Sequence, residues 1–172
     1  AYMKGLKNVT AYIAGEGIVK TNIGFENGKS AYIGDDDKNI ESLFETDGVV
    51  LPGFIDEHIH GAGGADAMDA TEEALQTISE YVSREGTTGF LATTMTQSKE
   101  NISKALKNVK EVREKGEYKG AEVLGVHLEG PFISPKHVGA QPLEYVAKPE
   151  AKTFDEYNAL SGGNIKIVTL AP

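Results

Sequence analysis

Two histidines separated by one residue lie in the segment Asp56–Gly61, directly after a short apolar run. If this segment is a β-strand, His58 and His60 point to the same side, because side chains alternate along a strand. Two imidazoles on one side can bind one metal ion, whereas Ile59 points the other way, into apolar packing. The alternative is that both histidines simply end a strand and never bind a metal.

A carboxylate follows another apolar run, in the segment His127-Leu128-Glu129-Gly130-Pro131-Phe132. The carboxyl ends of parallel strands meet at one edge of a sheet, where α/β barrels place their active sites. Glu129 can therefore join His58 and His60, and two histidines with one carboxylate are a frequent ligand set for Zn²⁺ or Fe²⁺. The alternative for Glu129 is an ion pair with a lysine. His127 is expected to support the site or the fold rather than to bind the metal.

The segment Gly139-Ala140-Gln141-Pro142 is a candidate substrate loop. A glycine-containing loop above the strand ends can offer backbone N–H groups to a substrate. An ordinary connecting loop explains the same composition equally well. The earlier stretch Gly61–Gly64 lacks the lysine and hydroxyl residue of a phosphate-binding loop, so we interpret it as a sharp turn.

Strands and helices are expected to alternate from residue 49 onward. Apolar runs predict strands at Val49–Ile55, Gly89–Thr94, Glu122–His127 and Ile165–Leu170, and apolar spacing predicts helices at Asp69–Glu85, Ser98–Lys115 and Thr153–Leu160. Either Asp69 or Thr71 can cap the first helix, and Ser98 can cap the second. This rhythm is typical of a parallel sheet and leaves two architectures, a doubly wound sheet or a (β/α)₈ barrel. About four βα units are present, whereas a closed barrel needs eight strands and roughly 250 residues.

Residues 1–48 have a different pattern, in which short β-prone runs are separated by Gly and Asn turns. The expected strands are Val9–Ile13, Gly17–Ile23 and Ser30–Ile33. We interpret residues 1–48 as part of a small β-sandwich or β-sheet domain, and residues 49–172 as the α/β domain.

Composition argues against several classes of function. The formal net charge is -9 at pH 7, so the surface repels phosphate backbones and no nucleic-acid partner is expected. The chain contains no Cys, which excludes thiolate metal sites and fits a cytoplasmic location. No apolar run is long enough for a membrane helix, and the start of the chain lacks the apolar region of a signal peptide, so no membrane partner is expected.

Taken together, these segments resemble the N-acetylglucosamine-6-phosphate deacetylase family of the amidohydrolase superfamily. Leu51–Gly61 is similar to the first-strand signature that dihydroorotases, hydantoinases and several deaminases share. His127–Phe132 is more specific to the sugar deacetylases, and Gly139–Pro142 and Ile167–Pro172 are also similar to their pattern. The resemblance implies an α/β fold: the first half of a (β/α)₈ TIM-type barrel, truncated after strand 4, with the N-terminal part of a small β-sandwich.

The same resemblance implies hydrolysis of the acetamide of N-acetylglucosamine 6-phosphate to glucosamine 6-phosphate and acetate. His58, His60 and Glu129 match metal-ligand positions for one or two divalent ions, with Zn²⁺ expected first and Fe²⁺, Co²⁺ or Mn²⁺ as alternatives. Ala140 and Gln141 match substrate-binding positions, although many members carry a histidine where Gln141 stands.

The resemblance places the catalytic Asp, the later metal-binding histidines and the groups that hold the sugar phosphate beyond Pro172. We therefore expect no general acid or base within residues 1–172 and no deacetylase activity from these residues alone. The complete protein is expected to be a homodimer. Because its strand edges are open, the isolated piece is expected either to associate or to be accompanied by its other half.

Three other functions fit the same residues. The first is an amidohydrolase that acts on a cyclic amide or on another N-acetyl sugar phosphate. The second is a non-catalytic module that binds a sugar phosphate or a metal without turnover. The third is a purely structural domain whose histidine pair never contacts a metal.

Overall fold

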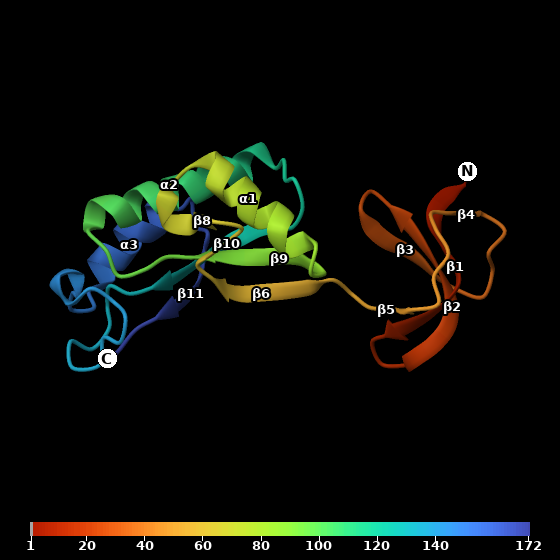
Figure 1. The fold of residues 1–172 in the computed structure, drawn as a ribbon, viewed down its shortest axis with the longest axis horizontal. Coiled ribbons are helices and arrows are strands. Elements are labelled where there is room, and N and C mark those ends of the chain that lie inside the picture. The colour runs from red at the N-terminus through yellow and green to blue at the C-terminus, as the bar shows by residue number, and fades with distance from the viewer. Residues whose placement is uncertain (1) are drawn as a thin grey trace. The chain divides into compact units, whose positions relative to one another are not determined.

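The computed structural model describes residues 2–172, which form two compact units, one up to Pro52 and the other Gly53–Pro172 (Figure 1). The expected boundary at residue 48 lies just before this division. Val49 and Val50 account for the difference, because they pair with the first strand of the chain and so belong to the first unit.

The first unit is a five-stranded sheet of mixed direction. Its strands are β1 (Met3–Ile13), β2 (Gly17–Glu26), β3 (Lys29–Gly34), β4 (Ile40–Ser42) and β5 (Val49–Val50). β1 pairs antiparallel with β2 and parallel with both β4 and β5. Leu6, Val9, Ala11 and Ile23 form its small core. The three expected strands are present and longer than predicted, whereas β4 is too short to leave a periodic pattern. The strand predicted at Val49–Ile55 is interrupted: Val49–Val50 form β5 in this unit, and the chain returns to strand only at Phe54.

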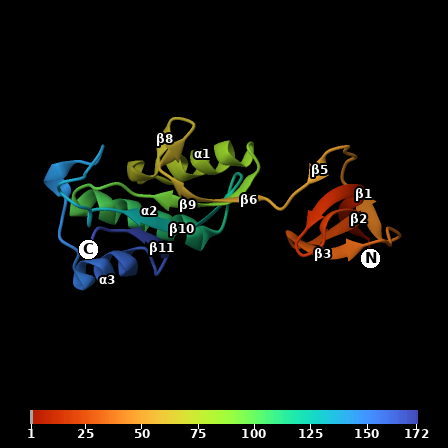
Figure 2. The same ribbon diagram turned by 90° about the horizontal axis from the view of Figure 1, so that it is seen from below.

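The second unit is built on a four-stranded parallel sheet in the order β11-β10-β9-β6. Its strands are β6 (Phe54–Ile59), β9 (Thr87–Thr93), β10 (Glu122–Glu129) and β11 (Ile165–Thr169). Spatial order follows chain order (Figure 2), and three helices cover one face of the sheet (Figure 1). A doubly wound sheet reverses its strand order and carries helices on both faces. The arrangement is therefore that of a half barrel, and the doubly wound alternative is wrong.

Helices follow the first three parallel strands along the chain, one after each strand. They are α1 (Glu72–Ser83), α2 (Lys99–Lys115) and α3 (Ala151–Leu160), with single 3₁₀ turns η1 (Ala67–Asp69) and η2 (Leu143–Tyr145) and a small hairpin of β7 (Gly61–Ala62) and β8 (Ala65–Asp66). The predicted cap of α2 is confirmed, since the Ser98 hydroxyl accepts a hydrogen bond from the Asn101 N–H at 3.2 Å.

The first helix begins later than the predicted Asp69. Thr71 caps α1 by accepting from the Ala74 N–H at 3.1 Å. Asp69 is committed elsewhere, because its carboxylate accepts the Asp66 N–H at 2.8 Å and closes the η1 turn. Asp69 and Thr71 are both good capping residues, so residue type alone could not separate them.

The main core lies between the parallel sheet and its helices. Leu75 and Ile78 of α1, Ile102 and Leu106 of α2, and Phe90 of β9 have no solvent exposure. The four helix residues among them lie at the three- and four-residue spacing of a buried helix face. Among residues 2–172, no helix combines the length and apolar character needed to cross a membrane.

Candidate metal centre

His58 and His60 lie at the carboxyl end of β6, and their ring centroids are 5.0 Å apart. Ile59 between them points away and packs against the main core. The Ile59 N–H donates to the hydroxyl of Thr93 at 3.0 Å, which ties β6 to the neighbouring strand at this point. The alternation expected of a strand thus brings both imidazoles to one side.

The His60 ring is oriented by a main-chain group of β9. Its Nδ1 lies 3.2 Å from the carbonyl oxygen of Thr93. A carbonyl oxygen only accepts, so Nδ1 carries the proton and Nε2 presents a lone pair. A second group that orients a histidine in this way is typical of imidazoles that bind metals.

Glu129 completes the cluster from the end of β10. Its Oε2 lies 2.8 Å from His60 Nε2, and one ligand atom from each of His58, His60 and Glu129 falls within 4.8 Å of the others. With the His60 proton on Nδ1, the short contact joins two acceptors. Two acceptors approach this closely only when a proton or a cation lies between them, so the donor set fits a divalent ion.

Three protein ligands leave room for water on a metal ion, as in catalytic rather than structural zinc sites. His58 is exposed, and His60 and Glu129 are partly buried, so the cluster is open to solvent and to a substrate. The residues expected to bind a metal are therefore brought together at one edge of the sheet.

His127 lies beside the cluster but has neither nitrogen free. Its Nδ1 lies 3.1 Å from the Glu57 carbonyl oxygen and 3.2 Å from His58 Nδ1, and its Nε2 lies 2.8 Å from the Thr169 hydroxyl. The ring is 7% exposed. It links β6, β10 and β11, which agrees with the supporting role expected from the sequence.

The candidate substrate loop reaches the cluster through one of its two predicted residues. Gln141 Nε2 donates to Glu129 Oε2 at 3.3 Å, and its Oε1 accepts from the Thr96 N–H at 2.7 Å. Ala140 is exposed on the same loop. Neither contact identifies a substrate, so the substrate-binding role of both residues stays a prediction.

Thr93, Thr96 and Thr169 are the residues near the site that the sequence analysis missed. Thr93 and Thr96 act through main-chain groups, and Thr169 acts through its hydroxyl, which contacts the His127 ring. Their only signal in the sequence is a position at or just after the end of a strand. Gly130 also has a steric role. Its φ is +73°, and a Cβ placed on it would lie 2.0 Å from the Thr96 hydroxyl oxygen, so no side chain fits there.

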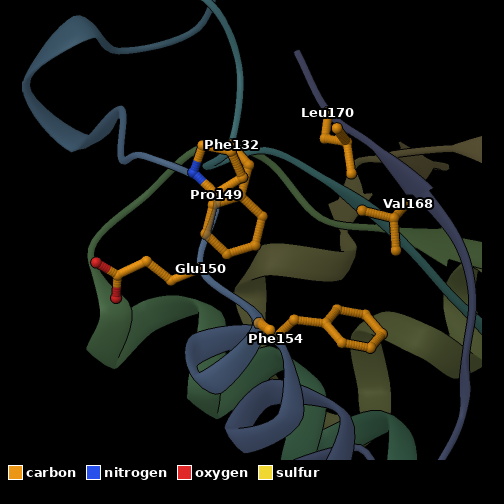
Figure 3. A pocket seen from close by; sticks show the side chains of 7 residues that line it. Phe132, Pro149, Glu150, Phe154, Val168 and Leu170 are labelled. Carbon is orange, nitrogen blue, oxygen red and sulfur yellow. The ribbon is translucent and has the colours of Figure 1, made fainter. Parts of the chain in front are cut away.

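An apolar pocket lies away from the metal cluster, between α3 and β11 (Figure 3). Phe132, Phe154, Val168 and Leu170 contribute most of its lining. None of the three candidate ligands lines it, so we assign the chemistry to the strand ends.

The chain is similar to several known proteins. The sequence pattern of the amidohydrolase family matches residues 49–172. The chain is 43% identical to the N-acetylglucosamine-6-phosphate deacetylase of Bacillus subtilis (strain 168). The alignment covers 97% of this chain and 44% of that protein. It is also 37% identical to the N-acetylgalactosamine-6-phosphate deacetylase of Escherichia coli O157:H7, and that alignment covers 76% of this chain and 35% of that protein.

A solved structure shows the same fold. The N-acetylglucosamine-6-phosphate deacetylase of Thermotoga maritima superposes with a TM-score of 0.75 and 29% identity, over 88% of this chain and 39% of that one. The chain thus spans less than half the length of the relatives that it matches.

Proposed function

The chain belongs to the amidohydrolase family, and from this premise we propose that the natural protein carrying it is a metal-dependent N-acetylglucosamine-6-phosphate deacetylase. The observation that carries the proposal is the convergence of His58, His60 and Glu129 at the carboxyl edge of the parallel sheet. Relatives that match nearly the whole chain carry the name of this enzyme. The reaction releases acetate and leaves glucosamine 6-phosphate.

The proposed roles follow from the chemistry of an amide, which resists water at neutral pH. A bound divalent ion would supply Lewis acidity, polarising the amide carbonyl and activating water. His58 and His60 would hold the ion through ring nitrogens, and the Glu129 carboxylate would offset part of its charge. Zn²⁺ is the first expectation, and Fe²⁺, Co²⁺ and Mn²⁺ accept the same ligands. Three ligands suffice for one ion, and a second ion would need groups beyond them.

Proton transfer to the departing amine needs a general acid. By family resemblance this acid is an Asp beyond residue 172. The rest of the natural protein is proposed to complete a (β/α)₈ barrel and a small β-sandwich, and the complete protein is proposed to be a homodimer. The 172-residue chain by itself is therefore proposed to release no acetate. Ala140 and Gln141 are proposed to contact the sugar substrate.

Metal content and acetate release test the proposal in the natural protein. Elemental analysis should find a divalent ion that His58→Ala and His60→Ala remove and that His137→Ala retains. His137 is the matched control, because it is an exposed histidine outside the cluster. Acetate release from N-acetylglucosamine 6-phosphate should stop with a chelator and return with Zn²⁺. Turnover that survives complete metal removal would contradict the proposal.

A second substrate is favoured by one comparison, the relative named for N-acetylgalactosamine 6-phosphate. The two sugars differ only in the configuration of one hydroxyl. The ratio of kcat/KM for the two phosphates decides between them, and a higher value for the galactosamine compound would reassign the substrate.

A further inference from the structure

β9 lies between β6 and β10 in the sheet, yet it supplies none of the three candidate metal ligands. Its carboxyl end nevertheless contacts the ligand sets on both sides. The Thr93 carbonyl accepts from His60, which follows β6, and the Thr96 N–H donates to Gln141, which in turn donates to Glu129 of β10. The central strand thus reaches one ligand directly and the other through a single side chain.

The orientation of the Gln141 amide is determined by its partners. The Thr96 N–H only donates, so the atom that faces it at 2.7 Å must be the amide oxygen. The NH₂ group is then directed to Glu129 Oε2 at 3.3 Å. An amide donor holds a carboxylate without bringing a positive charge that would repel a metal ion. A lysine or a protonated histidine in the same place would add that repulsion.

We propose that Gln141 is a positioning residue for Glu129: its amide, anchored on the Thr96 N–H, holds the carboxylate in the orientation that faces His58 and His60. The inference rests on the proposed metal site and adds a role for Gln141 besides contact with a substrate. Residues outside the ligand set that orient a ligand typically change metal affinity by about 10- to 100-fold when replaced.

Gln141→Met is the decisive variant, because it preserves the length of the side chain and removes both hydrogen bonds. Zn²⁺ affinity is measured by competition with a chromogenic chelator in the natural protein. We expect binding to weaken by about 10- to 100-fold, while the melting temperature of the metal-free protein falls only slightly, because the Thr96 N–H loses its partner. The visible spectrum of the Co²⁺ form should also change, because the geometry of the Glu129 ligand changes. A merely structural role would lower the metal-free melting temperature and leave Zn²⁺ affinity and the Co²⁺ spectrum unchanged.

Gln97→Met is the matched control. Gln97 lies in the loop after β9, next to Thr96, but its side chain accepts from the Ser98 N–H and the Asn101 amide and makes no hydrogen bond to Glu129. Its replacement should leave Zn²⁺ affinity unchanged. Gln141→Asn is a second test that retains an amide, but the shorter side chain cannot span Thr96 and Glu129, so we expect the same weakening.

Two results would overturn the inference. If Gln141→Met raises KM while Zn²⁺ affinity stays within about twofold of the unaltered protein, Gln141 acts on the substrate alone. If Gln97→Met weakens Zn²⁺ binding as much as Gln141→Met, the effect comes from a disturbance of the loop that holds Thr96 and not from the Gln141 amide. Failure of the unaltered protein to bind metal would overturn the proposed function itself, and that result is distinguishable from the other two.

Discussion

On the helix-covered face of the parallel sheet, Phe90, Leu75 and Leu106 pack with no exposure to solvent. At the carboxyl ends of the same strands, His58 is exposed and His60 and Glu129 are only partly buried. The first region removes apolar surface from water, which stabilises the fold. The second brings together groups that approach this closely only with a proton or a cation between them. The difference indicates that stability and metal binding depend on separate residues, although both lie on the same strands.

The largest effect is expected in the buried region. Phe90→Ala should lower the free energy of unfolding by about 3–5 kcal/mol, because it removes a fully buried ring and leaves a cavity. Urea denaturation of the metal-free protein measures this. Phe54→Ala is the matched control, since Phe54 is 57% exposed on β6 and should change stability far less. Equal losses for the two variants would break the distinction between core and strand end.

The strand ends should show the opposite behaviour. Glu129→Gln retains the shape of the side chain but removes its charge, so Zn²⁺ binding should weaken by about 100-fold or more, beyond the loss typical of residues that merely orient a ligand. The metal-free protein should be as stable as before, because the amide NH₂ can donate to His60 Nε2 where two acceptors now meet. Isothermal titration and urea denaturation give the two numbers, and a large loss of metal-free stability would contradict the comparison.

A buried hydroxyl tests whether polar groups inside the core act like those at the site. Ser79 has no solvent exposure, donates to the Ala121 carbonyl at 2.6 Å and accepts from the Gly120 N–H at 3.0 Å. Ser79→Ala leaves both main-chain groups unpaired, so we expect a loss of about 1–3 kcal/mol with metal affinity unchanged. Ser103→Ala is the control, because Ser103 is only partly buried and bonds within its own helix. A similar loss in both variants would argue against the hydrogen bonds as the cause.

The smallest effect is expected for the ion pair between Lys99 of α2 and Glu156 of α3, which lies in solvent. The hydrogen bond and charge of Lys99 lower the pKa of Glu156, so any stability from this carboxylate is present above its unfolded pKa and lost as pH falls through its folded pKa. Lys99→Met should return that pKa to its ordinary range in an NMR titration, with no measurable change in unfolding because solvent screens the pair. A clear loss of stability would show that α3 docks through charge.

The core could be predicted from the sequence because periodicity reports directly on burial. Leu75, Ile78 and Val82 recur at helical spacing, and all three are buried. The grouping of His58, His60 and Glu129 could also be predicted, because their residue types and their positions at strand ends imply where they meet. The grouping depends only on the rule that parallel strands end at one edge.

The orienting contacts could not be predicted in the same way. Gln141 meets Glu129 only because the loop after β10 folds back toward Thr96, and no local pattern encodes that return. The Thr93 carbonyl leaves no signal at all, since every residue has one. The start of α1 could not be predicted either, because Asp69 and Thr71 are both good capping residues and only the structure separates them.

The contact between His60 and the Thr93 carbonyl has a consequence for how this site tolerates mutation. Because the acceptor is main chain, no substitution at position 93 that preserves the strand can delete it. Thr93→Val would remove only the hydroxyl that accepts the Ile59 N–H. Substitutions at residue 93 should therefore not change which nitrogen of His60 carries the proton. The orientation of Glu129, in contrast, depends on one side chain, that of Gln141, which a single substitution can remove.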